Sequence, residues 1–168
     1  MALLEILTYP NSALKKVCVA VDEIDDKLRA LADDMLQTMY NAPGIGLAAP
    51  QVGRGMRLVV MDVPLTEDKR TGPLVLINPR IVEREGNIAI EEGCLSLPGL
   101  NHEVDRSARV VVEALDRQGE PLRLEAEGLL AICLQHELEH LDGKLFIDHL
   151  SPLKRALYKK RRLKENKD

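Results

Sequence analysis

Aromatic side chains are scarce in this 168-residue sequence, which has no tryptophan, one phenylalanine and an aromatic content of only 2%. Proteins that bind single-stranded nucleic acids usually stack the bases on exposed aromatic rings, so this composition argues against that mode of binding. Hydrophobic residues of all kinds still make up 45% of the chain. The sequence therefore predicts one domain with a sizeable core built mainly from aliphatic side chains.

The sequence also lacks a recognisable signal peptide and any apolar run long enough to cross a membrane. Cysteine occurs three times, at Cys18, Cys94 and Cys133, and an odd number does not suit a disulfide framework. We therefore expect a reduced, cytoplasmic protein with no disulfide bonds and no membrane partner. Internal repeats and low-complexity linkers are absent as well.

Charge is distributed unevenly along the chain. Residues 151–168 contain eight Lys or Arg and two Asp or Glu, a net charge of +6. The preceding 150 residues contain 15 and 25 of these types, a net charge of −10, so the two parts together give the total of −4. The end of the chain is therefore a basic segment on an acidic body, which in the simplest interpretation is a solvated terminal helix.

The sequence HELEH at residues 136–140 is the strongest indication of function. Residues four apart lie on one face of a helix, so His136 and His140 can each give a nitrogen to the same divalent ion. Glu137 would then stand beside the metal-bound water as a general base. The alternatives are a hydrogen-bonded structural pair of histidines or a solvated pair. Leu129 and Ile132 fall on the same helical stripe as the histidines, which favours a buried site and hence a metal.

A third protein ligand is needed, because catalytic zinc-type sites usually have three. The position that would carry the last histidine of a metzincin motif is Phe146, and the only glutamate after His140 is Glu165, in the basic tail. We therefore select Cys94, upstream in the segment EEGCLSLPG, although taken alone it is equally consistent with a ligand, a reactive thiol or a buried packing residue. Cys133 is interpreted as a small buried hydrophobe near the site.

The remaining pattern predicts an α+β fold. A helix is expected over residues 23–41, and strands over residues 57–63, 74–78, 80–84, 108–115 and 122–126, divided by glycine, proline and charged turns. We expect antiparallel sheets packed around a central helix that carries HExxH, with an N-terminal helix and a C-terminal basic helix.

Residues 44–53, GIGLAAPQVG, superficially match a dinucleotide-binding loop, but a helix precedes them and Pro50 opposes a following helix. By themselves they indicate a turn of small residues packed on the core. Together with EGCLS at 92–96 and QHELEH at 135–140, however, GIGLAAPQ at 44–51 resembles the three motifs of peptide deformylase, in the family's order and spacing. The resemblance covers nearly the whole chain.

The resemblance implies removal of the N-formyl group from the initiator methionine of nascent polypeptides, with release of formate. Cys94, His136 and His140 would hold the metal, which the family resemblance implies is Fe(II), with zinc, nickel or cobalt able to substitute. Glu137 would be the general base and acid. Residues 1–150 would form the catalytic domain, and residues 151–168 the basic helix or tail.

Further positions match the family's contacts to the substrate. Gln51 would donate a side-chain hydrogen bond to the oxyanion, and the backbone N–H of Leu95 would be the second donor. Gly46 would allow an extended peptide to approach the backbone. The aliphatic positions that resemble the methionine pocket are Ile45, Ile90, Leu129, Ile132 and Cys133.

One departure from the family concerns the fourth residue of the helix motif, which is usually Asp and here is Glu139. The family usually places an arginine partner at the position of Arg106, so we expect a pair between Glu139 and Arg106. The extra methylene puts the geometry of this pair in question, and leaves the metal ligands unaffected.

The resemblance also implies that the basic tail, residues 152–167, binds ribosomal RNA near the peptide exit. We expect Leu153 and Leu157 to anchor this helix on the body, with the cations of residues 159–162 facing outward.

Two rival activities are another metal-dependent amidase or peptidase and a cysteine hydrolase with Cys94 as its nucleophile. A binding module without catalysis fits less well, because Glu137 would have no purpose there.

Overall fold

The first long helix, α1 (Asp26–Asn41), forms where apolar residues recur every three to four positions. Asp25 caps it, because its Oδ1 accepts a hydrogen bond from the Leu28 N–H at 3.0 Å. The helix thus begins three residues later than the expected residue 23. Its buried face includes Leu28, Ala32, Met35 and Met39, which lie against the larger sheet.

The larger sheet contains five antiparallel strands in the order β1-β2-β3-β6-β7. Their bounds are β1 (Gly46–Ala48), β2 (Leu58–Met61), β3 (Leu74–Glu85), β6 (Arg109–Leu115) and β7 (Pro121–Glu127). A second sheet pairs β4 (Ile88–Cys94) with β5 (Leu97–Arg106). The prediction of mixed helices and antiparallel sheets is confirmed.

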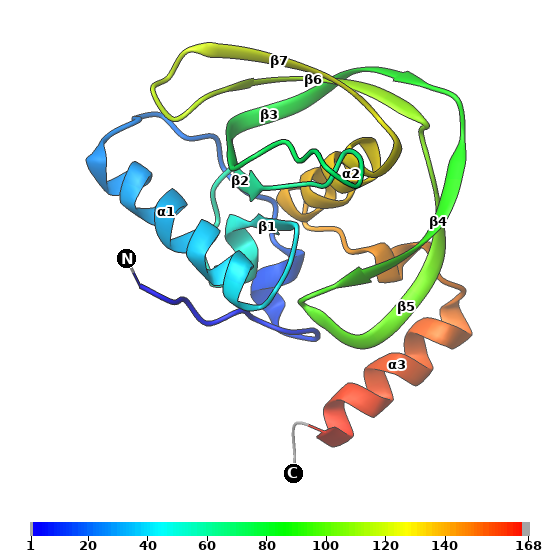
Figure 1. Cartoon of the computed structure of the whole chain (residues 1–168). Helices are drawn as coiled ribbons and strands as arrows, with labels where there is room; N and C mark the ends of the chain where they lie inside the picture. Colours follow the sequence, from blue (N-terminus) through cyan, green and yellow to red (C-terminus); the bar gives the residue numbers. More distant parts are fainter. Residues whose placement is uncertain (1, 166–168) are drawn as a thin grey trace.

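Strand β2 is buried on both faces because helices cover both sides of the sheet at this point. Leu58 and Val60 belong to the hydrophobic cluster beneath α1, whereas Val59 and Met61 belong to the cluster beneath α2 (Gly128–Leu141). This alternation is the two-residue period of a strand. Figure 1 shows β1 and β2 between the two helices, and α2 enclosed between the larger sheet and the β4–β5 sheet.

The break expected between residues 78 and 80 was wrong. Residues 74–78 and 80–84 form the single strand β3, in which the pairing with β6 shifts register between Ile77 and Arg80. Asn78 adopts a positive φ of 51° there, and its side chain exchanges hydrogen bonds with the backbone of Val21. A bulge therefore absorbs Asn78 and the following proline without ending the strand. Strands β1, β4 and β5 were not expected from the sequence.

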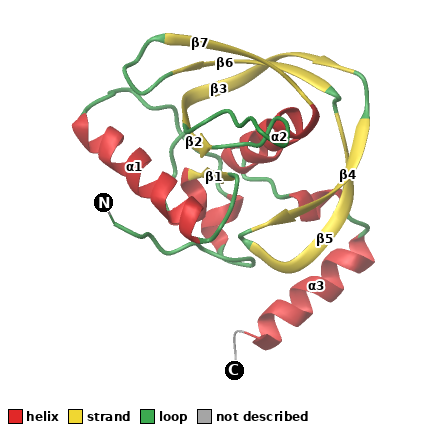
Figure 2. Ribbon diagram, in the orientation of Figure 1, coloured by secondary structure: helices red, strands yellow, loops and turns green. Residues whose placement is uncertain are grey.

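In the described part of the chain, short 3-10 helices connect these elements: η1 (Ser12–Lys15), η2 (Ala49–Val52) and η3 (Phe146–His149). The computed structural model describes residues 2–165, so the outer end of the basic tail, residues 166–168, lies outside the described residues. Figure 2 shows the last described helix, α3 (Pro152–Glu165), beside the β4–β5 sheet. No helix in this described part is long and apolar enough to cross a membrane.

The expected anchoring of α3 was wrong. Leu153 and Leu157 are 70% and 59% exposed, and the helix is instead held by Tyr158 and Arg162, which are buried. The Tyr158 hydroxyl donates to the Pro98 carbonyl at 2.9 Å, and Arg162 donates to the backbone carbonyl of Tyr9 at 3.1 Å. A phenol hydroxyl and a guanidinium can donate hydrogen bonds to these backbone carbonyls, whereas a leucine side chain has no donor.

Of the cations expected to face outward, Lys159 and Lys160 are exposed, but Arg162 is buried. Arg161 is exposed as expected, although its guanidinium lies 4.9 Å from the centre of the Tyr158 ring. The exposed face of α3 therefore combines leucines with lysines and Arg161.

Candidate metal centre

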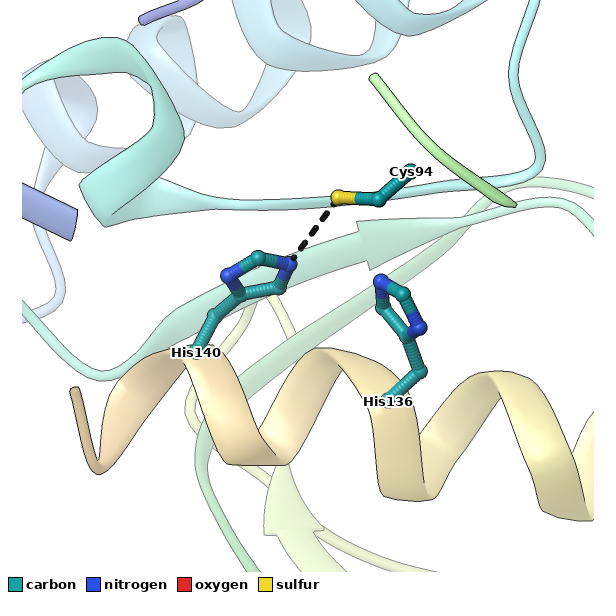
Figure 3. Close-up of side chains that lie close together, drawn as sticks. All are labelled: Cys94, His136 and His140. Carbon is teal, nitrogen blue, oxygen red and sulfur yellow. Dashed lines mark hydrogen bonds between the residues drawn. The ribbon is translucent and has the colours of Figure 1, made fainter. Parts of the chain in front are cut away.

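Helix α2 places His136 and His140 one turn apart, on the face that looks toward Cys94 at the end of β4 (Figure 3). The two imidazole centroids are 5.1 Å apart. The Cys94 sulfur and one nitrogen of each imidazole all lie within 4.8 Å of one another, and the sulfur is 3.5 Å from Nε2 of His140. The fold thus brings together the three residues that the sequence suggested as ligands.

The alternatives of a structural or solvated histidine pair do not agree with this geometry. His140 is only 1% exposed, so it is not solvated. Among the described residues, its Nδ1 is the one buried side-chain nitrogen or oxygen without a hydrogen-bond partner. Two buried imidazoles and a sulfur are a donor set that suits a transition-metal ion, so these residues fit the metal that the sequence suggested.

The protonation of the histidines follows from their surroundings. Burial lowers the pKa of His140 well below its usual range, and the charges of His136 and Arg106 lower it further. His140 is therefore neutral, which is the form that binds metals. Burial also opposes charge on His136, but its contacts with Cys94, Glu92 and Glu137 outweigh burial and raise its pKa well above the ordinary value. The groups around His136 therefore favour a positive charge at this site.

The orientation of His136 is set by Glu92, whose Oε1 lies 2.9 Å from Nδ1 of His136. This contact leaves Nε2 of His136 free to face Cys94. Arg106 donates two hydrogen bonds of 2.9 Å to the same carboxylate. Burial alone would raise the pKa of Glu92, but the hydrogen bonds from Arg106 and His136 outweigh burial and hold this pKa below its usual value. Sequence reasoning gave Glu92 no role. Its position two residues before Cys94, on the same side of one strand, was the available signal.

The expected pair between Glu139 and Arg106 is present: Nη1 of Arg106 donates to Oε1 of Glu139. The second oxygen of Glu139 faces Nε2 of His149 at 2.9 Å. The longer acid therefore still reaches its arginine, and it gains a second partner in η3.

A cavity of about 430 Å³ lies beside the candidate ligands, and Cys94 and His136 form part of its wall. Glu137 is 3% exposed and contributes to the wall, and burial raises its pKa to about 7. The aliphatic part of the wall contains every residue expected to receive the methionine side chain: Ile45, Ile90, Leu129, Ile132 and Cys133. The cavity therefore combines a titratable carboxyl group with an aliphatic wall.

Gly46, Gln51 and Leu95 also line this cavity. The Gln51 amide is held in one orientation, because its Oε1 accepts from the Ala48 N–H at 2.9 Å and its Nε2 donates to the Ser96 hydroxyl at 3.0 Å. The same Nε2 lies 3.6 Å from the Cys94 sulfur. A fixed amide donor thus stands at the edge of the candidate metal centre.

The chain is similar to known proteins in both sequence and structure. The profile of the family described as polypeptide deformylase matches residues 3–156. A peptide deformylase from Alkalilimnicola ehrlichii is 57% identical over 155 residues, covering 92% of this chain and 86% of that protein. The crystal structure of a peptide deformylase from Legionella pneumophila has a TM-score of 0.89 at 47% identity, covering 99% of this chain and 96% of that one. The structure from Ehrlichia chaffeensis in complex with actinonin has a TM-score of 0.95 at 38% identity and covers both chains completely.

Proposed function

The chain belongs to the polypeptide deformylase family, and from this premise we propose that it removes the formyl group from the N-terminal formyl-methionine of nascent polypeptides. The reaction is a hydrolysis: an oxygen from water bonds to the formyl carbon, the C–N bond breaks, and formate and a free amine are released. The proposal rests on the cavity, whose wall combines Cys94 and His136 of the Cys-His-His cluster with a buried carboxyl group and aliphatic side chains.

Cys94, His136 and His140 would hold one divalent ion, Fe(II) in the native protein, with zinc, nickel or cobalt as possible substitutes. A divalent ion at this position would polarise the formyl carbonyl and lower the pKa of a water molecule. Glu92 would keep His136 oriented for this task through its 2.9 Å contact with Nδ1.

Glu137 would take the proton from the attacking water and return it to the leaving amine. A carboxyl group with a pKa of about 7 suits both steps near neutral pH, because it accepts and releases a proton with similar ease. The Gln51 amide and the Leu95 N–H would stabilise the negative charge that develops on the formyl oxygen.

The substrate would lie along β1, which is an edge strand of the larger sheet. Gly46 in this strand would let the peptide backbone approach and pair with it. The methionine side chain would enter the aliphatic part of the cavity, formed by residues such as Ile45, Ile90 and Ile132. A flexible thioether packs well against aliphatic groups.

The replacement Glu137→Gln tests the proposed chemistry. We expect the variant to retain its metal and to release formate from formyl-Met peptides about 10² times more slowly or worse, the usual scale for losing a general base. Glu103→Gln, an exposed change on β5, is the matched control and should behave like the wild type. Full activity in Glu137→Gln with metal bound would remove Glu137 from the mechanism.

Two further measurements separate the rival activities. Acetyl-Met peptides separate the proposed activity from that of a general amidase: we expect them to be cleaved far more slowly than formyl-Met peptides, because an acetyl methyl group is bulkier than a formyl hydrogen. A cysteine hydrolase would work in the presence of a chelator until its thiol is alkylated, whereas the proposed enzyme would lose activity in chelator and regain it with added metal.

Residues 1–150 would act as the catalytic domain, and the basic segment 151–168 would dock on ribosomal RNA near the peptide exit. The exposed lysines of α3 support this docking, since the rest of the chain is acidic and repels phosphate. Affinity should fall steeply with salt, with a log-log slope of about −0.7 for each phosphate neutralised on a single strand.

Charge reversal on the exposed face tests the docking without disturbing the buried Arg162. We expect Lys160→Glu combined with Lys164→Glu to weaken co-sedimentation with ribosomes at low salt and to leave formate release from short peptides unchanged. Lys27→Glu combined with Lys69→Glu, two exposed reversals outside α3, makes the same change in net charge and is the matched control. Unaltered sedimentation of the double variant would show that α3 does not dock on RNA.

A further inference from the structure

A continuous chain of side-chain contacts runs from the candidate metal centre to the surface. It begins at His136, passes through Glu92, Arg106 and Glu139, and ends at His149. Each link is a contact between a charged group and a hydrogen-bonding partner, and the side chains of Glu92 and Arg106 are only 4% exposed. His149, at the outer end, is 40% exposed.

This chain connects the elements that supply the candidate ligands. Glu92 belongs to β4, two residues before Cys94, and Arg106 belongs to β5. Glu139 belongs to α2, next to His140. The contacts of Arg106 therefore tie the β4–β5 sheet, which carries the sulfur ligand, to the helix that carries both imidazoles. Any freedom in Glu139 would loosen this connection.

Glu139 has a longer and more mobile side chain than an aspartate would have at this position. Its extra methylene adds one rotatable bond, and an acid held at one oxygen alone can swing about that bond. In this chain both carboxylate oxygens are occupied, Oε1 by Arg106 and Oε2 by His149 at 2.9 Å. The second contact restricts the additional bond.

We infer that His149 is a positioning residue, which compensates for the longer side chain of Glu139 and so keeps Arg106, Glu92 and finally His136 aligned for metal binding. The inference rests on the proposed metal site, and it assigns a role in that site to a surface residue of η3. It explains how the chain tolerates the departure at Glu139 without changing any ligand.

The replacement His149→Leu tests the inference, because it removes the ring nitrogen that contacts Glu139 and leaves an apolar side chain in its place. With the full chain loaded with Co(II) or Zn(II), we expect metal release into excess chelator to become about 3- to 10-fold faster. Losing a group that contacts a ligand directly usually costs roughly 10- to 100-fold, and His149 acts at a greater distance, so its effect should be at or below the lower end of that range. The visible absorption bands of the Co(II) protein should also change. His149→Gln, whose Nε2 can still donate to Glu139, should restore the wild-type release rate and spectrum.

A second set of variants shows whether His149 acts through the length of Glu139. In a Glu139→Asp background the acid is too short to share between Arg106 and His149, so His149→Leu should have no further effect on metal release. Equal effects of His149→Leu in the Glu and Asp backgrounds would overturn the inference. So would a His149→Leu protein that unfolds more easily but keeps the wild-type release rate and Co(II) spectrum, because His149 would then be only structural. A wild-type protein that binds neither ion would instead contradict the proposed function.

Discussion

Gly46 leaves the space that the carboxyl group of Glu137 occupies. A Cβ atom added to Gly46 would lie 2.6 Å from Oε2 of Glu137 and 2.9 Å from the sulfur of Cys133. An alanine at position 46 would therefore push the end of the Glu137 side chain out of its present position, toward the cavity that this residue lines. Glycine is therefore needed here for its lack of a side chain, in addition to any contact with a substrate.

We expect Gly46→Ala to keep its metal and to lose activity by about 10²-fold, since displacing a catalytic group by about 1 Å can cost this much. Formate release and metal content measured on the same sample would separate the two effects. Gly55→Ala is the matched control, because a Cβ there meets nothing within 4 Å. Normal turnover in Gly46→Ala would mean that Glu137 can work from another position.

The two cysteines near the site should behave differently when replaced. Burial raises the pKa of the Cys133 thiol well above its ordinary value, so this residue stays protonated and is a poor ligand. Cys94 instead lies in the cluster with both histidines. Elemental analysis should therefore find that Cys94→Ala loses metal and that Cys133→Ala retains it. Similar metal loss in both variants would contradict the assignment of Cys94 as the ligand.

For individual residues of the site, the sequence predicted which of them lie close together better than it predicted what each of them does. The spacing of His136 and His140 required only a helix, so their proximity could be predicted directly. Cys94 could not be distinguished from a packing residue without the family resemblance. Glu92 was missed because its contact with Arg106 depends on the pairing of β4 with β5, and its contact with His136 on how α2 lies against β4, neither of which the sequence revealed.

At the scale of elements, β4 and β5 escaped prediction because they are only partly buried. Most residues of β4 are exposed or half-buried on both faces, so the usual alternation of apolar and polar residues is weak. In β3 the error was the opposite one, because a break was expected where the strand in fact continues. Asn78 and Pro79 are strong local signals for the end of a strand. Pairing with β2 and β6 on either side of the bulge outweighs them.

Helix α3 is held against the body largely by Tyr158 and Arg162. Replacing Tyr158 by Phe removes the hydroxyl that donates to the Pro98 carbonyl, and this should lower the free energy of unfolding by about 1 kcal/mol. Leu157→Ala on the exposed face of the same helix should change it by less than about 0.5 kcal/mol. Chemical denaturation measures both values. The reverse order would mean that the leucine face anchors the helix after all.

For the whole molecule, the scarcity of aromatic residues makes ionisation of the tyrosines easy to follow. The chain has three tyrosines and no tryptophan, so ultraviolet absorbance reports them with little background. Burial is the main cause that raises the pKa of each tyrosine above 10, assisted for Tyr40 by its hydrogen bond to Asp62. The Tyr40 value reaches about 12.

We therefore expect an alkaline titration of the native protein to show all three phenolates forming above pH 10, whereas the same protein in denaturant should form them near pH 10. A group whose pKa is raised by folding stabilises the native state below its unfolded pKa, and this contribution is lost as the pH rises through the folded pKa. Stability should consequently decline from about pH 10, with the Tyr40 contribution lost by about pH 12. Asp62→Asn should move the highest transition back toward 10, because the neutral amide no longer opposes a phenolate. A native tyrosine that titrates at its ordinary value would show that the hydroxyl of at least one ring is in free contact with water.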